Sequence, residues 1–252
     1  MGSRSYIGIV LAIFILLPAA CRPGGPDIGL PEVPARDLVS ALEQRERAFS
    51  TLSAVAGLQV ERKGRRRGFD TAGILLDDGK RLKIEAYGPL GDPLFTILWT
   101  DQAPLVRLGG GGDAVDMGIG MERILGMDMD KEELSAVLSG HIPAKAFSSQ
   151  SRAFCGPAEC IVEFLDGDNV RRIYLTSGDL LPAVYEVYNR GSLLLRARFE
   201  NFETAFGYAM PMRVIIANPG KKTLLTIDYA DVTINSVLAD EAFTIPGEGS
   251  GQ

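Results

Sequence analysis

The sequence has few of the residues on which catalytic and metal-binding chemistry most often depends. Its 252 residues include one histidine, one tryptophan and three cysteines. His141 lies in a turn after a predicted helix, and a lone histidine without a partner triad is more typical of a helix end than of a catalyst. Ser135 and Ser139 lack the context of a nucleophile elbow, and no zinc-protease, P-loop or dinucleotide motif is present. We therefore expect no enzymatic activity, no cofactor and no metal.

Positive charge is scarce as well. The chain has 26 Lys and Arg against 32 Asp and Glu, a formal net charge of -6 and a pI near 5.0. This balance argues against nucleic-acid binding, which normally requires a basic face. The exception is the segment 62–67, with five cations in six residues. A solvated hairpin tip is the favoured interpretation, and contact with anionic lipid headgroups is the alternative.

Only one long hydrophobic run is present, Tyr6 to Leu17, and it is too short for a membrane span of about 20 residues. With Arg4 before it, this run predicts an export signal over residues 1–20. The small residues before Cys21 resemble a bacterial lipobox, although Pro18 occupies the usual leucine position. Lipidation of Cys21 is favoured over ordinary cleavage that leaves a free thiol. Residues 21–36, rich in Pro and Gly, predict a flexible tether.

The remaining cysteines, Cys155 and Cys160, flank a Gly-Pro turn between strand-like runs. An oxidising compartment would permit a disulfide that closes this hairpin. A metal site would require two further soft ligands, and none is nearby in the sequence. A disulfide is therefore the favoured interpretation of the cysteine pair.

The acidic run Asp128 to Glu133 lacks the spacing of oxygen ligands that a calcium loop requires, and helix capping explains it.

Alternating apolar residues and closely spaced turns dominate the chain. With 46% apolar residues the chain can bury a substantial core, and one domain is favoured over two. Short strands joined by hairpin turns predict a mainly β fold, an antiparallel meander curled into an incomplete barrel. The predicted strands are 55–62, 69–77, 80–101 as a hairpin, 104–108, 147–154, 160–165, 171–176, 183–189, 193–202, 211–217 and 222–232.

Three helices are predicted beside the strands. The first opens the domain with Asp37 as its cap, and the second follows Asp113, although Gly118 and Gly120 weaken it by about 1 kcal/mol each. The third has Asp130 as N-cap and ends at Gly140. The last two lie in the middle of the chain, where they could cover one mouth of a curved sheet.

The hairpin Lys80 to Asp101 contains an unusual turn, Gly88-Pro-Leu-Gly-Asp-Pro93. The two Gly and two Pro suit a turn, whereas Leu90 at its tip gains nothing from exposure to water. The strand that follows is apolar at almost every position, so both of its faces require cover.

Apolar side chains of this strand and of the mid-chain helices could fill a core or line a lipid cavity. Filling a core is the default, and periodicity alone does not separate the two. The candidates for an acyl cavity are Leu94, Ile97, Trp99, Met117, Met121, Leu134 and Leu138.

The order of these motifs resembles the LolA/LolB-like family of periplasmic lipoprotein carriers and outer-membrane acceptors. The resemblance covers roughly residues 35–246: a helix, a basic hairpin, the GPLGDPLF hairpin, mid-chain helices ending in LSGHIP, and a meander closing with MPMRVII and AFTIP. Because of the lipobox, it is closer to the membrane-anchored acceptors. The sequence differs in its imperfect lipobox, in the 155–160 cysteine pair and in the arginine-rich turn.

The resemblance implies a helical lid over an apolar cavity that holds the acyl chains of a client lipoprotein. It also implies a protruding loop whose exposed leucine helps to deliver lipoproteins into the membrane, and the matching residue is Leu90. We expect residues 37–246 to form this domain, with a disordered tail at 247–252. The expected protein is a lipid-anchored, non-enzymatic acceptor on the periplasmic face of the outer membrane, with a soluble periplasmic carrier as a possible partner. The alternative is an envelope structural or interaction lipoprotein with the same fold and a filled interior.

Overall fold

The computed structural model describes residues 27–77, 80–100, 104–109, 114–115, 117–127 and 129–244. The predicted signal peptide, the lipidation site Cys21 and the tail 247–252 lie outside these residues. The strands are β1 (Glu32–Val33), β2 (Thr51–Arg62), β3 (Arg65–Asp77), β4 (Arg81–Tyr87), β5 (Pro93–Trp99), β6 (Leu105–Leu108), β7 (Ala114–Val115), β8 (Gln150–Cys155), β9 (Glu159–Asp166), β10 (Asn169–Thr176), β11 (Pro182–Asn189), β12 (Ser192–Ala205), β13 (Tyr208–Asn218) and β14 (Thr223–Ile234). The helices are α1 (Arg36–Arg47), α2 (Met117–Leu125) and α3 (Lys131–Ser139), with 3-10 turns η1 (Ala144–Ser148) and η2 (Asp240–Phe243).

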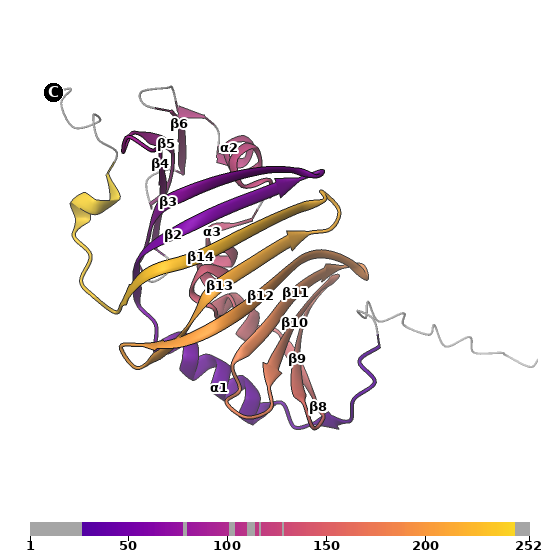
Figure 1. Ribbon diagram of the computed structural model, residues 1–252. Coiled ribbons are helices and arrows are strands. Elements are labelled where there is room, and N and C mark those ends of the chain that lie inside the picture. The colour runs from indigo at the N-terminus through magenta and orange to yellow at the C-terminus, as the bar shows by residue number, and fades with distance from the viewer. Residues whose placement is uncertain are drawn as a thin grey trace, which may run out of the picture.

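The strands form one antiparallel sheet in the order β1-β8-β9-β10-β11-β12-β13-β14-β2-β3-β4-β5-β6-β7. Figure 1 shows this sheet curling strongly from β8 at one edge to β6 near the other, with α3 behind β13 and β14. Among the described strands, β1 and β7 do not pair with each other, so the sheet stays open. The predicted fold class is confirmed: the chain is mainly β, with an unclosed, curved antiparallel sheet and helices in the middle of the chain.

The segment between the predicted tether and the first helix differs from expectation. Glu32 pairs with Phe154 of β8, so the sheet includes residues near the end of the 21–36 segment. Helix α1 begins at Arg36 with Ala35 as its N-cap, and no side chain caps it. Asp37 was therefore the wrong choice of cap. It lies in the first turn, where a carboxylate still complements the helix dipole.

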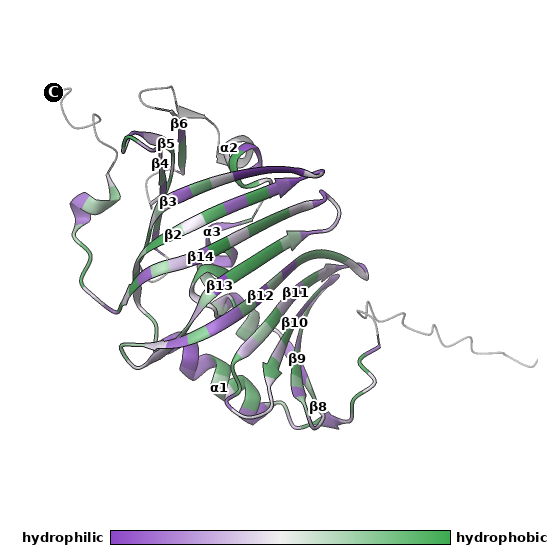
Figure 2. Cartoon of the chain, viewed as in Figure 1, coloured by the Kyte–Doolittle hydropathy of each residue, from purple (hydrophilic) through white to green (hydrophobic). Residues whose placement is uncertain are grey.

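Alternation along the strands produces one main core. In β2 the residues Leu52, Ala54, Ala56 and Leu58 are buried, and their neighbours in sequence are more exposed. Figure 2 shows the same banding of hydrophobic and hydrophilic residues along β2 and β14. Because successive side chains point to opposite faces, one face of each strand contributes to the interior of the curl.

Helix α3 has the ends that its sequence predicts. The Asp130 side chain accepts a hydrogen bond from the Glu133 backbone N–H at 2.7 Å, which satisfies one of the free donors of the first turn. At the other end, Gly140 has φ 70°. A Cβ there would lie 2.6 Å from the Pro211 ring of β13. Glycine at this position therefore lets the helix end directly against the sheet.

Helix α2 covers β6, and its glycine has a packing role. A Cβ at Gly120 would lie 2.6 Å from the side chain of Val106 in β6. The sequence suggests only that this glycine weakens the helix, whereas the structure shows that it permits close contact with the sheet. No helix among the described residues has both the length and the apolar character needed to cross a membrane.

Candidate functional site

The turn between β4 and β5 is held by its own backbone. The Gly88 N–H donates to the Asp92 carbonyl at 2.7 Å, and the Gly91 N–H donates to the Gly88 carbonyl at 3.0 Å. Gly91 has φ 84°, a conformation that favours glycine. Two hydrogen bonds within five residues define the turn, so the residue at its tip has a fixed direction relative to the hairpin.

That tip is Leu90, with 94% of its side chain exposed. The strands behind it are buried: Ile84 of β4 pairs with Ile97 of β5, and both belong to the main core. The outer face of β5 is covered as well, because Leu98 packs with Phe243 of η2. The two strands of the hairpin are thus packed on both faces, and the leucine at its tip is exposed.

Polar side chains stiffen the base of this turn. The Tyr87 hydroxyl donates to Glu85 at 2.7 Å, the Thr96 hydroxyl donates to Glu85 at 3.0 Å, and Lys83 Nζ lies 3.3 Å from it. Burial alone would raise the pKa of Glu85, but the Tyr87 hydrogen bond and the Lys83 charge outweigh it and lower that pKa. Burial and the bond to Glu85 raise the pKa of Tyr87 to about 12. At neutral pH the cluster therefore keeps a charged carboxylate and a neutral phenol.

The residues predicted to line an acyl cavity come together inside the curl. Ile97, Met121, Leu134 and Leu138 are buried in one hydrophobic cluster. Leu94 and Trp99 are partly buried and pack against the same cluster. Only the backbone of Met117 is described, at the start of α2. The strand β5 and the two mid-chain helices thus contribute to a common interior.

Three surface cavities lined by described residues lie elsewhere, and none of the three is lined by these seven residues. One of about 370 Å³ lies beside α3, and one of about 320 Å³ lies between α3 and β12. The largest, about 580 Å³, is lined by cations of the turns at 62–63 and 220–222. The predicted residues whose side chains are described therefore lie in or against the buried cluster and not around any of these three cavities.

Helix α3 is attached to the interior face of the sheet by three tyrosines. Tyr208 donates to the Ser139 carbonyl at 2.9 Å, and Tyr229 donates to the Leu138 carbonyl at 2.7 Å. The third, Tyr185, donates to the Glu133 carboxylate, which is itself buried. Burial raises the pKa of Glu133 above its ordinary value. These polar groups of α3 satisfy one another only while the helix stays docked on the sheet.

His141 and Ser135 line the cavity beside α3, but they do not form a nucleophile–base pair. The Ser135 hydroxyl has no hydrogen-bond partner among the described residues, and His141 Nδ1 lies 3.1 Å from the Ile142 carbonyl. Burial lowers the pKa of His141 to about 4, and its ring packs on Phe49. No group of three His, Cys, Asp or Glu side chains in the described ranges could hold a metal ion.

The cysteine pair and the basic segment both lie at hairpins, as the sequence predicts. Cys155 at the end of β8 and Cys160 in β9 form a disulfide across the β8–β9 turn. The basic segment 62–67 forms the β2–β3 turn and the start of β3. The Arg67 guanidinium lies 4.8 Å from the centroid of the Phe69 ring, whose flank it covers.

Sequence reasoning missed a second exposed apolar tip, Phe206. It lies in the tight turn between β12 and β13 with φ 51° and is 71% exposed. The signal was available in the sequence, because Phe206-Gly207 separates two apolar runs as a turn does. Reasoning from the sequence also missed the approach of Lys221 and Lys222 to the basic turn, which depends on the pairing of β14 with β2.

Three of the solved structures that share this architecture come from different bacteria. A LolA superfamily protein from Nitrosomonas europaea matches with a TM-score of 0.56 and 14% identity, over 84% of this chain and 98% of that one. The chain has a LolA-type fold. An outer membrane lipoprotein-sorting protein domain from Vibrio parahaemolyticus matches with a TM-score of 0.57 and 12% identity, over 82% and 94%. A DUF1329 family protein from Desulfovibrio piger matches with a TM-score of 0.55 and 13% identity, over 82% and 95%.

At these identities the likeness is one of fold. No protein-family model and no curated protein matches the sequence. The resemblance expected from the motifs is thus confirmed for the LolA-type fold, while the closer similarity to membrane-anchored acceptors stays a prediction.

Proposed function

We propose that this chain is a non-enzymatic, lipid-anchored protein of the bacterial outer membrane that binds acyl chains and delivers lipoproteins to that membrane. The observation that carries the proposal is Leu90, 94% exposed at the tip of a turn held by its own hydrogen bonds. An exposed leucine gains no free energy in water, whereas its transfer into hydrocarbon is favourable by about 1.5–3 kcal/mol.

The LolA-type fold supports the binding step. One of the similar structures is a lipoprotein-sorting protein domain by name. In the present chain, β5, α2 and α3 contribute apolar side chains to one interior, as an acyl site requires. Each methylene moved between interior and bilayer changes the free energy by about 0.8 kcal/mol, so a deliverer must hold its client about as well as the membrane does. Lipidation of Cys21 would keep the protein at the membrane that receives the client.

Replacing Leu90 by Glu tests the delivery step. The full lipidated chain is loaded with a fluorescent triacylated lipoprotein and mixed with vesicles, and the transferred fraction is followed over time. We expect Leu90→Glu to lower the transfer rate more than tenfold while client binding stays unchanged, because the charge prevents the tip from entering hydrocarbon. The matched control is Phe206→Glu, which places the same charge on an exposed apolar side chain at the tip of another hairpin. Normal transfer by Leu90→Glu would end the assignment.

A second candidate has the same fold and a different role. Ile97 and Leu138 are fully buried in the described interior, and side chains packed in this way favour an envelope interaction protein that takes up no lipid. The two candidates differ in whether a free acyl chain binds with saturation, so an acyl probe separates them.

A further inference from the structure

Two turns from distant parts of the chain lie side by side at one end of the sheet. Because β14 pairs with β2, Thr223 lies opposite Arg62. The Lys63 backbone N–H then donates to the Lys222 carbonyl at 3.1 Å, which joins the β2–β3 turn to the β13–β14 turn. Both turns are basic, so the pairing concentrates cations that the sequence separates by about 160 positions.

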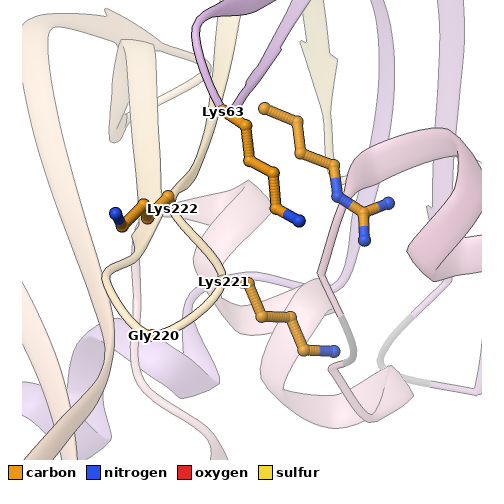
Figure 3. A pocket seen from close by; sticks show the side chains of 5 residues that line it. Lys63, Gly220, Lys221 and Lys222 are labelled. Atoms are coloured by element: carbon orange, nitrogen blue, oxygen red, sulfur yellow. The ribbon is translucent and has the colours of Figure 1, made fainter.

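These cations surround a cavity of about 580 Å³. Figure 3 shows Lys63 and Lys221 extending on the same side of the turns, with Lys222 directed away from them. The volume lies in the range typical of small-molecule sites. The cavity is lined by Arg62, Lys63, Gly220, Lys221 and Lys222.

Within the described part of the chain, one carboxylate forms ion pairs with cations of this cavity. Glu122 of α2 lies 3.2 Å from Arg62 Nη2 and 3.4 Å from Lys221 Nζ. No ion pair is formed by Lys63 or Lys222 among the described residues. The Arg62 and Glu122 side chains are each 42% exposed, and ion pairs with that exposure are weak and easily exchanged. The four cations around the cavity therefore outnumber the one carboxylate that pairs with them, in a chain whose formal net charge is -6.

The beginning of β3 extends this positive surface. Arg65 has no ion-pair partner in the described ranges, while Arg66 lies 3.3 Å from Glu61. Residues 63–68 are exposed at a hairpin turn, as the interpretation favoured by the sequence expects. The structure also adds Lys221 and Lys222 to these charges, because the neighbouring hairpin ends at the same level.

We propose that this cavity binds phosphate groups. A phosphate offers several oxygens at high negative charge, so it can accept from the planar Arg62 guanidinium and from the ammonium groups of Lys63 and Lys221 at once. Lys222, which points the other way, could contact a second phosphate of the same surface. The chemistry is shared by anionic lipid headgroups and by soluble phosphorylated compounds. The inference does not depend on lipoprotein delivery or on Leu90, and its failure would leave the proposed function standing.

The test uses the full chain carrying Cys21→Ser, so that no lipid anchor contributes, and compares three proteins. The first has no further change, and the second is Lys63→Gln/Lys221→Gln/Lys222→Gln. The third is a charge-matched control on exposed cations elsewhere, Arg36→Gln/Arg47→Gln/Arg198→Gln. Circular dichroism melting verifies that all three fold. Binding is measured with phosphatidylcholine vesicles, with vesicles containing phosphatidylglycerol, and with inorganic pyrophosphate.

We expect the parent protein to prefer phosphatidylglycerol vesicles and the lysine variant to bind them about 100-fold less tightly. The reason is that each cation near an anionic surface adds roughly fivefold. The control should stay within about twofold of the parent, since its cations lie away from the cavity. If pyrophosphate raises the melting temperature of the parent and not of the lysine variant, without any preference for anionic vesicles, the phosphate chemistry stands and its source is soluble. Equal losses in the lysine variant and the control, or no binding of either anion by the parent, would overturn the proposal.

Discussion

In the described part of the chain, two hairpin turns carry an exposed large apolar side chain at the tip, and they differ in how they are held. Leu90 lies between β4 and β5, and Phe206 lies between β12 and β13 at the opposite end of the sheet strands. Exposure alone does not separate them, since the side chains are 94% and 71% exposed. The packing below each tip does.

The Phe206 hairpin is anchored at its base by other parts of the chain. Arg45 of α1 donates to the Ala209 carbonyl at 2.6 Å, and its guanidinium lies 4.3 Å from the Tyr208 ring centroid. Tyr208 in turn bonds the end of α3. This end of the sheet therefore serves to dock the helices, and its exposed tip follows from a tight turn.

The Leu90 turn has no comparable anchor. Among the described residues, no side chain outside the hairpin bonds to residues 88–92, and the turn is closed by its own backbone. An apolar tip becomes a functional candidate when the fold gives it no structural task. Leu90 meets that condition better than Phe206.

The end of the sheet where the helices dock, here called the docking end, includes Tyr208, Phe49 and His141. Its stability should depend on pH through His141. Its pKa is lowered to about 4 by burial, against about 6.5 in the unfolded chain, so between these values only the unfolded state takes up the proton. Stability contributed by the neutral ring is therefore present above pH 6.5 and is lost as pH falls toward 4. From pH 7 to pH 5 we expect a loss of about 1–2 kcal/mol in the free energy of unfolding.

Urea unfolding of the parent and of His141→Asn at both pH values measures this effect. The variant lacks the proton uptake, so its free energy of unfolding should change less with pH by the same amount. Other titrating groups, such as Glu133, contribute equally to both proteins. Identical pH dependence in the two would show that His141 is not tied to the packing of the docking end.

A smaller effect is expected at Phe206 itself. Its φ of 51° lies in the left-handed region, which costs an ordinary residue about 1–2 kcal/mol, whereas asparagine tolerates it better. We predict that Phe206→Asn raises the free energy of unfolding by about 0.5–1 kcal/mol. Leu90→Ala should leave it within about 0.5 kcal/mol, because that leucine has no positive φ and little packing to lose. Thermal melts of both variants test the contrast, and a destabilised Phe206→Asn would mean that the aromatic tip packs on something.

Local patterns in the sequence were enough to predict most of the fold. Alternation predicted the meander, and Asp130 and Gly140 predicted both ends of α3. Leu90 was recognised from the sequence because a leucine between glycines and prolines is out of place in a turn. Features that depend on local backbone preference were accessible in this way.

What the sequence did not reveal depends on contacts between distant segments. The two-residue strands β1 and β7 have no periodicity to detect, and they exist because a neighbour pairs with them. The cationic cavity requires the register that places Thr223 opposite Arg62. Gly120 was judged by its helix propensity, although the nearby side chain of Val106 decides its role. The burial of Ile97 and Leu138 likewise depends on packing that no periodicity encodes.

Uptake of an acyl chain is the central claim of this account, and titration with a fluorescent fatty-acid probe tests it most directly. The full chain carrying Cys21→Ser is titrated below the critical micelle concentration of the probe, with the same chain unfolded in urea as control. We expect saturable binding at about one site, accompanied by a blue shift of the probe emission and reversed by an excess of unlabelled fatty acid. Absence of saturable binding would contradict the account and leave an interaction protein with a filled interior.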